Sequence, residues 1–182
     1  MSALSEKSIR KSIVPSPKKN ARAARPQGRW VFLVLHNIRS LHNVGSIFRT
    51  ADGAGVSKIF LTGYTPSPVD VFGKYRREIS KTALGAEKYV PWEKPRPAAV
   101  LIKRLKRFNV QIVALEQTKG AVDYRKFKPE FPIALILGNE VRGLSKSVLQ
   151  KCDKIIYIPM RGRKESLNVS VAAGIALFSL VR

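Results

Sequence analysis

From residue 30 onward, short apolar segments rich in β-branched and aromatic residues alternate with segments in which apolar residues recur every three or four positions. The short segments predict strands buried on both faces of a sheet, and the longer ones predict amphipathic helices. The expected strands span residues 30–35, 57–61, 110–115, 133–137 and 155–158, and the expected helices span residues 43–51, 98–105, 144–150 and 167–181. We therefore predict an α/β fold with a mostly parallel sheet flanked by helices.

Four of the predicted strands are followed by loops that contain the polar residues best suited to chemistry. In parallel sheets, ligands gather at the edge where the carboxyl ends of the strands meet. We expect the functional site at that edge, in the loops that follow Leu35, Leu115, Leu137 and Ile158.

The charge of the chain narrows the range of partners. It carries 34 Lys and Arg residues against 12 Asp and Glu residues, a formal net charge of +22. This excess favours nucleic acid over a membrane, because no strongly amphipathic basic helix has an aromatic face. The single cysteine, Cys152, excludes an internal disulfide and a cysteine-rich zinc site, and it fits a reducing compartment. We expect no metal site, no membrane association and a cytoplasmic location.

The first 29 residues differ in composition from the rest. They are rich in Lys, Arg and Pro and contain Glu6 as their one acidic residue. Proline interrupts helices, and a segment with this composition cannot bury a core. We predict a disordered basic arm at residues 1–29 and a single domain at residues 30–182.

Residues 62–97 mix basic and aromatic side chains. Cations contact phosphates and aromatic rings stack on bases, so this composition favours contact with nucleic acid. The alternative is a solvated loop and helix whose aromatic rings pack into the core. The aromatic residues concerned are Tyr64, Tyr75, Tyr89 and Trp92.

Residues 36–50 follow the first strand and lead into the first helix. We expect Asn43 to cap that helix. Arg49 lies six positions later, nearly two helical turns, so we expect it on the side of Asn43 and facing the ligand edge of the sheet. The alternative is a surface arginine paired with Asp52, three positions further on.

Residues 137–144 contain two glycines around a polar pair. Gly138 and Gly143 allow the backbone to approach a ligand closely. The spacing is neither that of a P-loop nor that of a dinucleotide fingerprint, and Glu140 would repel phosphate. A ligand with positive charge or hydroxyl groups fits Glu140 better. The alternative is a β-turn in which Glu140 is solvated.

Residues 158–170 lead into the last helix. We expect either Ser166 or Asn168 to cap this helix, which leaves the other side chain to bind a ligand. The helix itself is apolar nearly all round, so it must be buried against the sheet, another helix or a second subunit.

Together, the three segments resemble the motifs of the SpoU (TrmH-like) RNA ribose 2′-O-methyltransferases of the SPOUT superfamily. The matching patterns are NxGxxxRT at residues 43–50, LGNExxGL at residues 137–144 and IPMxGxxxSLNVSVAxGI at residues 158–175. The resemblance implies a trefoil knot in the C-terminal half of the sheet, a homodimer, and S-adenosylmethionine bound in the knot. It also implies transfer of a methyl group to a ribose 2′-hydroxyl of tRNA or rRNA.

The resemblance also assigns roles to individual residues. Arg49 matches the catalytic arginine and Asn43 the residue that supports it. Because arginine is rarely deprotonated in proteins, we expect Arg49 to orient the substrate, with Glu140 or Ser166 aiding proton loss. A homodimer would allow Arg49 to act from the opposite subunit. The remaining catalytic position is Asn168, and the cofactor positions are Gly138, Ile158, Leu167, Leu115, Met160 and Asn168. The residues expected to contact RNA are Arg39, Lys74, Arg76, Arg77, Lys81, Arg142, Arg161 and Arg163.

Two other classes of protein remain as alternatives. A non-enzymatic basic RNA-binding protein associated with ribosomes would explain the charge equally well, but it would not explain Glu140 together with the Ser166-Leu167-Asn168 loop. A dinucleotide-dependent enzyme would need a glycine fingerprint after the first strand, where residues 36–43 read HNIRSLHN instead.

Overall fold

The computed structural model describes residues 29–95 and 97–182 and contains a seven-stranded parallel sheet with the strand order β3-β2-β1-β6-β4-β7-β5. The strands are β1 (Val31–His36), β2 (Lys58–Thr62), β3 (Trp92–Glu93), β4 (Gln111–Leu115), β5 (Val122–Asp123), β6 (Ile133–Leu137) and β7 (Lys154–Tyr157). The helices are α2 (Leu41–Gly53), α3 (Arg77–Ala83), α4 (Ala86–Tyr89), α5 (Ala98–Lys106), α6 (Lys146–Leu149) and α7 (Val169–Leu180). The predicted α/β architecture is confirmed.

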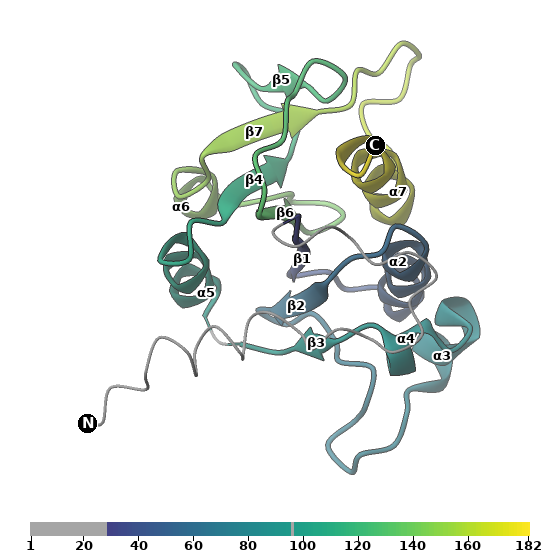
Figure 1. Cartoon of the computed structure of the whole chain (residues 1–182). Coiled ribbons are helices and arrows are strands. Elements are labelled where there is room, and N and C mark those ends of the chain that lie inside the picture. Colours follow the sequence, from purple (N-terminus) through teal and green to yellow (C-terminus); the bar gives the residue numbers. More distant parts are fainter. Residues whose placement is uncertain (1–28, 96) are drawn as a thin grey trace.

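Helices cover both faces of the sheet (Figure 1), with α2, α3, α4 and α7 on one side and α5 and α6 on the other. The alternation of side chains along β1 divides the core accordingly. Leu33 and Leu35 pack in the cluster that includes α2 and α7, whereas Phe32 and Val34 pack in the cluster that includes α5 and α6. The sheet is therefore buried on both faces, as its continuous apolar strands predict.

The order of the strands brings the expected loops to one edge. Strand β6 lies between β1 and β4, and β7 lies between β4 and β5. Leu35 and Leu115 are both in register with Leu137, and Leu115 is also in register with Ile156. The carboxyl ends of these four strands are therefore level, and the loops that follow them meet. The trefoil knot implied by the resemblance stays a prediction.

Some details of the fold differ from the expectations. Helix α2 begins two residues earlier than predicted, and Ser40 caps it by accepting a hydrogen bond from the backbone amide of Asn43. The prediction that Asn43 caps this helix was wrong. Asn168 caps α7, as one of the two expected alternatives. The edge strands β3 and β5 have two residues each, too few for a pattern of hydropathy to reveal.

The expectations about the N-terminal arm, membrane spans and metal sites can be compared only with the described residues. The predicted basic arm at residues 1–29 lies outside the described residues, except for Arg29, whose guanidinium lies 4.6 Å from the ring centre of Phe131. None of the helices in the described ranges is long and apolar enough to cross a membrane. Within the same ranges, no cluster of His, Cys, Asp and Glu side chains is placed to hold a metal ion.

Candidate active site

A cavity of about 340 Å³ opens at the carboxyl edge of the sheet, between the loops after β4, β6 and β7 and the start of α7. It contains most of the residues expected to bind a cofactor and two of those expected to be catalytic. Asn168 is at its edge but does not line it. The lining residues are Leu115, Glu116, Gln117, Leu137, Gly138, Asn139, Glu140, Val141, Gly143, Tyr157, Ile158, Met160, Glu165, Ser166, Leu167, Val169 and Ala172.

The wall after β6 is a closed turn. Asn139 and Gly143 exchange two backbone hydrogen bonds at 3.2 and 2.9 Å, and the side-chain oxygen of Asn139 accepts from the amides of Val141 and Arg142. A Cβ atom on Gly138 would lie 2.6 Å from the carbonyl carbon of Gly143. Gly143 itself has φ +61°, which favours glycine. Both glycines are thus required for the turn to close.

Glu140 ties this turn to the start of α2. Its carboxylate accepts hydrogen bonds from the backbone amides of Arg39 and Ser40 at 3.0 to 3.2 Å, and from the side-chain amide of Asn43 at 3.2 Å. Burial alone would raise the pKa of Glu140, but these donors outweigh it and lower the pKa. The alternative of a solvated Glu140 does not hold, because its oxygens are engaged by protein donors.

Asn43 and Asn168 complete a polar chain at the edge of the cavity. The side-chain amide of Asn168 donates to Oδ1 of Asn43 at 3.1 Å, while Asn43 donates to Glu140. Oδ1 of Asn168 in turn accepts from the amide of Ser170 and so caps α7. Three of the five residues predicted to be catalytic are therefore joined directly, and Ser166 lies in the same cavity wall.

Asn139 was not singled out in the sequence, although it is part of the second motif. Its side-chain amide donates to the backbone oxygen of Asn37 at 2.9 Å and to the hydroxyl of Tyr64 at 3.0 Å. Asn139 is buried, and these bonds join the loops that follow β1 and β2 to the turn after β6. It therefore fixes the relative positions of three loops at the carboxyl edge.

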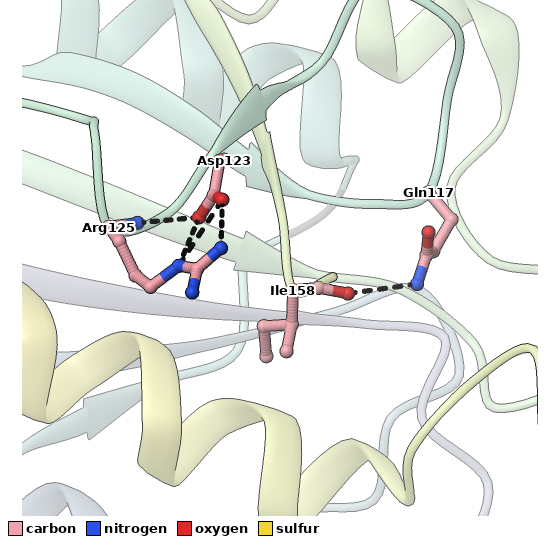
Figure 2. Close-up of polar contacts among 4 residues, drawn as sticks. All are labelled: Gln117, Asp123, Arg125 and Ile158. Atoms are coloured by element: carbon pink, nitrogen blue, oxygen red, sulfur yellow. Dashed lines mark hydrogen bonds and ion pairs between the residues drawn. The ribbon is translucent and has the colours of Figure 1, made fainter. Parts of the chain in front are cut away.

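Glu116 and Gln117 are two further residues that sequence reasoning missed. Glu116 accepts a hydrogen bond from the backbone amide of Leu144 at 2.8 Å. Gln117 donates from its side-chain amide to the backbone oxygen of Ile158 at 3.1 Å, so it joins the loops after β4 and β7 (Figure 2). The signal for both was their position directly after Leu115, at the end of a predicted strand.

Arg49 lies apart from the polar chain. Its side chain is exposed on α2, it does not line the cavity, and it forms no hydrogen bond or ion pair within residues 29–95 and 97–182. The alternative pairing with Asp52 is therefore not seen. Because the guanidinium has no acceptor within the described residues, it can form hydrogen bonds with a phosphate or with another subunit.

Most of the cations expected to contact RNA are exposed, and four of them lie on loops at the carboxyl edge of the sheet. Arg142 is in the turn after β6, and the amide of Arg39 holds Glu140, with both side chains exposed. Arg161 and Arg163 lie on the exposed loop between β7 and α7. The remaining four lie in or next to α3, where Arg76 is half-buried and Lys74, Arg77 and Lys81 are exposed.

The model of the SpoU rRNA Methylase family matches residues 30–178, which include the sheet and all three motif loops. The chain belongs to the SpoU family. The resemblance stated from the three motifs is thereby confirmed.

Several relatives of the chain have names that state an enzymatic activity or a substrate. The 23S rRNA (guanosine-2′-O-)-methyltransferase RlmB of Pectobacterium atrosepticum is 34% identical over 152 residues, which cover 82% of this chain and 59% of that protein. The AdoMet-bound rRNA methyltransferase of Sinorhizobium meliloti superposes with a TM-score of 0.76 at 32% identity, covering 86% of this chain and 57% of the other. A TrmH/SpoU tRNA modifying enzyme of A. aeolicus gives 0.72 at 31% identity, covering 83% and 73%.

This SpoU chain spans about three fifths of the length of the curated relatives that it matches. The match to the family model contains the cavity, because it extends past the last cavity residue, Ala172. The family similarity thus covers the site described above.

Proposed function

We propose that this chain is an RNA methyltransferase that transfers a methyl group from S-adenosylmethionine to a ribose 2′-hydroxyl of rRNA or tRNA. The observation that carries the proposal is the cavity walled by the loops of the second and third motifs, with Asn43, Glu140 and Asn168 joined at its edge. The names of the relatives agree with this chemistry. The compartment that we propose is the cytoplasm.

The cavity has properties suited to S-adenosylmethionine. Its volume lies at the lower end of the range for small-molecule sites, about 300–1,000 Å³. Leu115, Ile158 and Leu167 supply apolar surface for an adenine ring, while closely approaching backbone at Gly138 and Gly143 supplies polar groups without side-chain bulk. We propose Met160 as a further apolar contact and Asn168 as a polar contact at the edge.

The charge of the cavity is also informative. Three of the chain's 12 acidic residues line it, namely Glu116, Glu140 and Glu165, although the chain as a whole has a net charge of +22. Carboxylates repel RNA phosphates and attract a cationic ligand. When bound, S-adenosylmethionine supplies a methyl group on a positively charged sulfonium, and this charge remains as its net charge because its ammonium and carboxylate groups cancel.

Within the proposed reaction, Glu140 is a positioning residue. Its carboxylate oxygens accept the hydrogen bonds described above, and its lowered pKa makes it a weak base. We therefore propose that Glu140 positions the loops and that it is not the group that removes a proton. Ser166 remains the candidate among the cavity residues for a hydrogen bond to the substrate hydroxyl, because it lines the cavity on an exposed loop.

Arg49 is proposed to orient the RNA from a second subunit. A guanidinium forms two parallel hydrogen bonds with a phosphate and so fixes the direction of the neighbouring ribose. Helix α7 leaves Val171 and Phe178 about half exposed, at 51% and 53%, and it packs on the α2 helix that carries Arg49. A homodimer formed through this apolar surface would cover α7 and bring Arg49 to the partner's cavity.

The test is transfer of labelled methyl groups from S-adenosylmethionine to total RNA from cells that lack the gene, separated by size into tRNA and rRNA. We expect label in one size class with the wild-type chain and none with Arg49→Ala. Calorimetric titration with the cofactor accompanies the assay. Failure of both cofactor binding and methyl transfer would overturn the proposal in favour of a non-enzymatic RNA-binding protein.

A further inference from the structure

The loop between β2 and α3 projects beyond the sheet and its helices (Figure 1). Within it, Val69 and Tyr75 pair as an antiparallel bridge, so residues 69–75 form a short hairpin. The prolines Pro66 and Pro68 precede this hairpin and restrict the backbone that leads to it. We call residues 69–75 the projecting hairpin.

Internal hydrogen bonds hold the projecting hairpin in one conformation. The carboxylate of Asp70 accepts from the backbone amides of Phe72 and Lys74, both at 2.9 Å. The amide of Asp70 donates to the backbone oxygen of Lys74 at 2.8 Å, and Gly73 adopts φ +77° at the turn. The ammonium of Lys88 lies 5.3 Å from the ring centre of Tyr75. These contacts define the conformation of the hairpin, and its tip points away from the rest of the domain.

The tip of the hairpin is apolar and almost fully exposed. Val71 is 90% exposed and Phe72 is 84% exposed, while Tyr75 at its base and Tyr64 before it are 50% and 56% exposed. Single exposed apolar residues are common on protein surfaces. Two adjacent exposed apolar residues at the tip of a projecting hairpin form a larger apolar surface, and the packing of the core does not account for it. A partner that covers an aromatic ring would account for this arrangement.

The charges around the hairpin indicate which partner. Within residues 62–90, Lys74, Arg77, Lys81 and Lys88 are exposed. The acidic residues of the same segment are Asp70, which is used inside the hairpin, Glu87, which is buried, and Glu78, which is exposed. Exposed cations thus outnumber exposed carboxylates. The cations suit a polyanion, and the exposed aromatic rings suit a partner that carries planar aromatic groups.

The hairpin is connected to the cavity through Tyr64. The hydroxyl of Tyr64 accepts a hydrogen bond from Asn139 in the cavity wall, and the chain continues from Tyr64 into the hairpin. Tyr64 therefore links the cavity wall to the segment of the chain that carries the tip at Phe72.

We propose that the projecting hairpin binds unpaired RNA by stacking the ring of Phe72 on a base near the methylated nucleotide, while neighbouring cations contact the phosphates. This inference rests on the proposed RNA-methylating function and adds to it the kind of RNA that is bound. Aromatic rings stack on every base, and stacking is available only where bases are not already paired. The proposed substrate region is therefore single-stranded or a loop.

The test measures binding of fluorescein-labelled single-stranded RNA of mixed sequence, and of the corresponding duplex, to the full chain. We expect Phe72→Ala to weaken single-strand binding about 5- to 100-fold and Phe72→Tyr to restore it. Duplex binding should change much less. The matched control is Val100→Ala, which truncates another exposed apolar residue, on α5. The midpoint of thermal unfolding should be the same in all variants, because Phe72 makes little contact with the core.

The salt dependence separates stacking from charge. Phe72→Ala should leave the slope of log affinity against log salt unchanged, whereas Lys74→Ala should reduce its magnitude by about one. Equal losses for single-stranded and duplex RNA, or no loss, would overturn the inference while leaving methyl transfer intact. A change in oligomeric state on Phe72→Ala would also overturn it, since the tip would then contact a second copy. Absence of any RNA binding by the wild-type chain would instead overturn the proposed function.

Discussion

Asn168 at the start of α7 donates a hydrogen bond to Asn43 on α2 at 3.1 Å, although 125 residues separate them in the chain. The bond joins the first motif to the third, and Asn43 continues the connection to Glu140 in the second. Side-chain amides therefore link loops that come from distant parts of the sequence.

Removal of Asn43 should loosen the site more than the fold. Asn43→Ala deletes the acceptor for Asn168 and a donor to Glu140 but leaves the Ser40 cap of α2 in place. We expect the free energy of unfolding to fall by about 1 kcal/mol and kcat to fall at least tenfold. Urea unfolding and methyl-transfer kinetics measure the two effects.

The control for Asn43→Ala is Ser40→Ala, which removes the helix cap and leaves the Asn43 side chain intact. We expect it to lower stability by a similar amount, about 1 kcal/mol, with a smaller effect on kcat. Equal effects on kcat would show that Asn43 acts only through the stability of α2.

The closed turn after β6 predicts a steric effect at Gly138. A Cβ there would meet the backbone of Gly143 and Leu144 at 2.6 and 2.7 Å, so Gly138→Ala must displace one wall of the cavity. We expect a loss of about 1–3 kcal/mol in stability and at least a tenfold loss in affinity for S-adenosylmethionine. Gly162→Ala is the matched control, because a Cβ at that position would meet nothing within 4 Å.

The first motif illustrates what a sequence can and cannot predict. Hydropathy located every strand except the two-residue edge strands β3 and β5, with ends correct to within a residue or two, because strands buried on both faces are uniformly apolar. It also placed the site at the carboxyl edge. It could not predict that Ser40 rather than Asn43 caps α2, because both residues have capping side chains and three-dimensional contacts with Glu140 decide between them.

Other features of the site depend on contacts that no local pattern encodes. Asn139, Glu116 and Gln117 act through hydrogen bonds to loops far away in the sequence. The tip at Phe72 could not be told from a core residue, because an aromatic side chain between polar neighbours is compatible with either burial or exposure. The exposure of the hairpin follows from the position of its loop at the end of β2.

The charge of Glu140 should make the free energy of unfolding decrease at acid pH. Its pKa is lowered in the folded state, so it stabilises the fold above the pKa of the unfolded chain and loses this effect as pH falls through the folded value. We expect Glu140→Gln to be less stable than wild type by at most about 1 kcal/mol near pH 7, because solvent screens this partly exposed carboxylate, with the difference shrinking below about pH 4. Urea unfolding at both pH values measures this difference. A difference that stays constant with pH would contradict the role of the charge, and Glu130→Gln at an exposed position is the control.

His36 should contribute a second pH dependence, at higher pH. Burial lowers the pKa of His36, whose Nε2 accepts from the side-chain amide of Asn37 and whose Nδ1 then donates to Thr62. The unfolded chain therefore takes up a proton before the folded one does, and stability should fall as pH drops below about 6.5. Thermal unfolding between about pH 7.5 and pH 5.5 measures this loss.

The control for His36 uses the other histidine of the chain. We expect His36→Gln to flatten the pH dependence of the unfolding midpoint in that range, because glutamine does not titrate there. His42 is exposed, and His42→Gln should leave the slope as in wild type. A slope that His36→Gln leaves unchanged would contradict the prediction.

The position of Arg49 predicts that two impaired chains restore each other when the cofactor concentration is too low to fill the Gly138→Ala cavity. Arg49→Ala keeps an intact cavity, and Gly138→Ala keeps an intact Arg49 but a displaced cavity wall. If Arg49 acts across a homodimer, a mixed dimer contains one complete site. Random pairing of equal amounts makes half of the dimers mixed, so about a quarter of the wild-type activity should return after joint refolding. With Arg49 acting within its own chain, no mixed dimer would have a complete site, and activity would not rise above that of the two variants measured separately. The matched control replaces the second chain by one that carries both substitutions, which cannot supply Arg49 to any partner and should restore nothing.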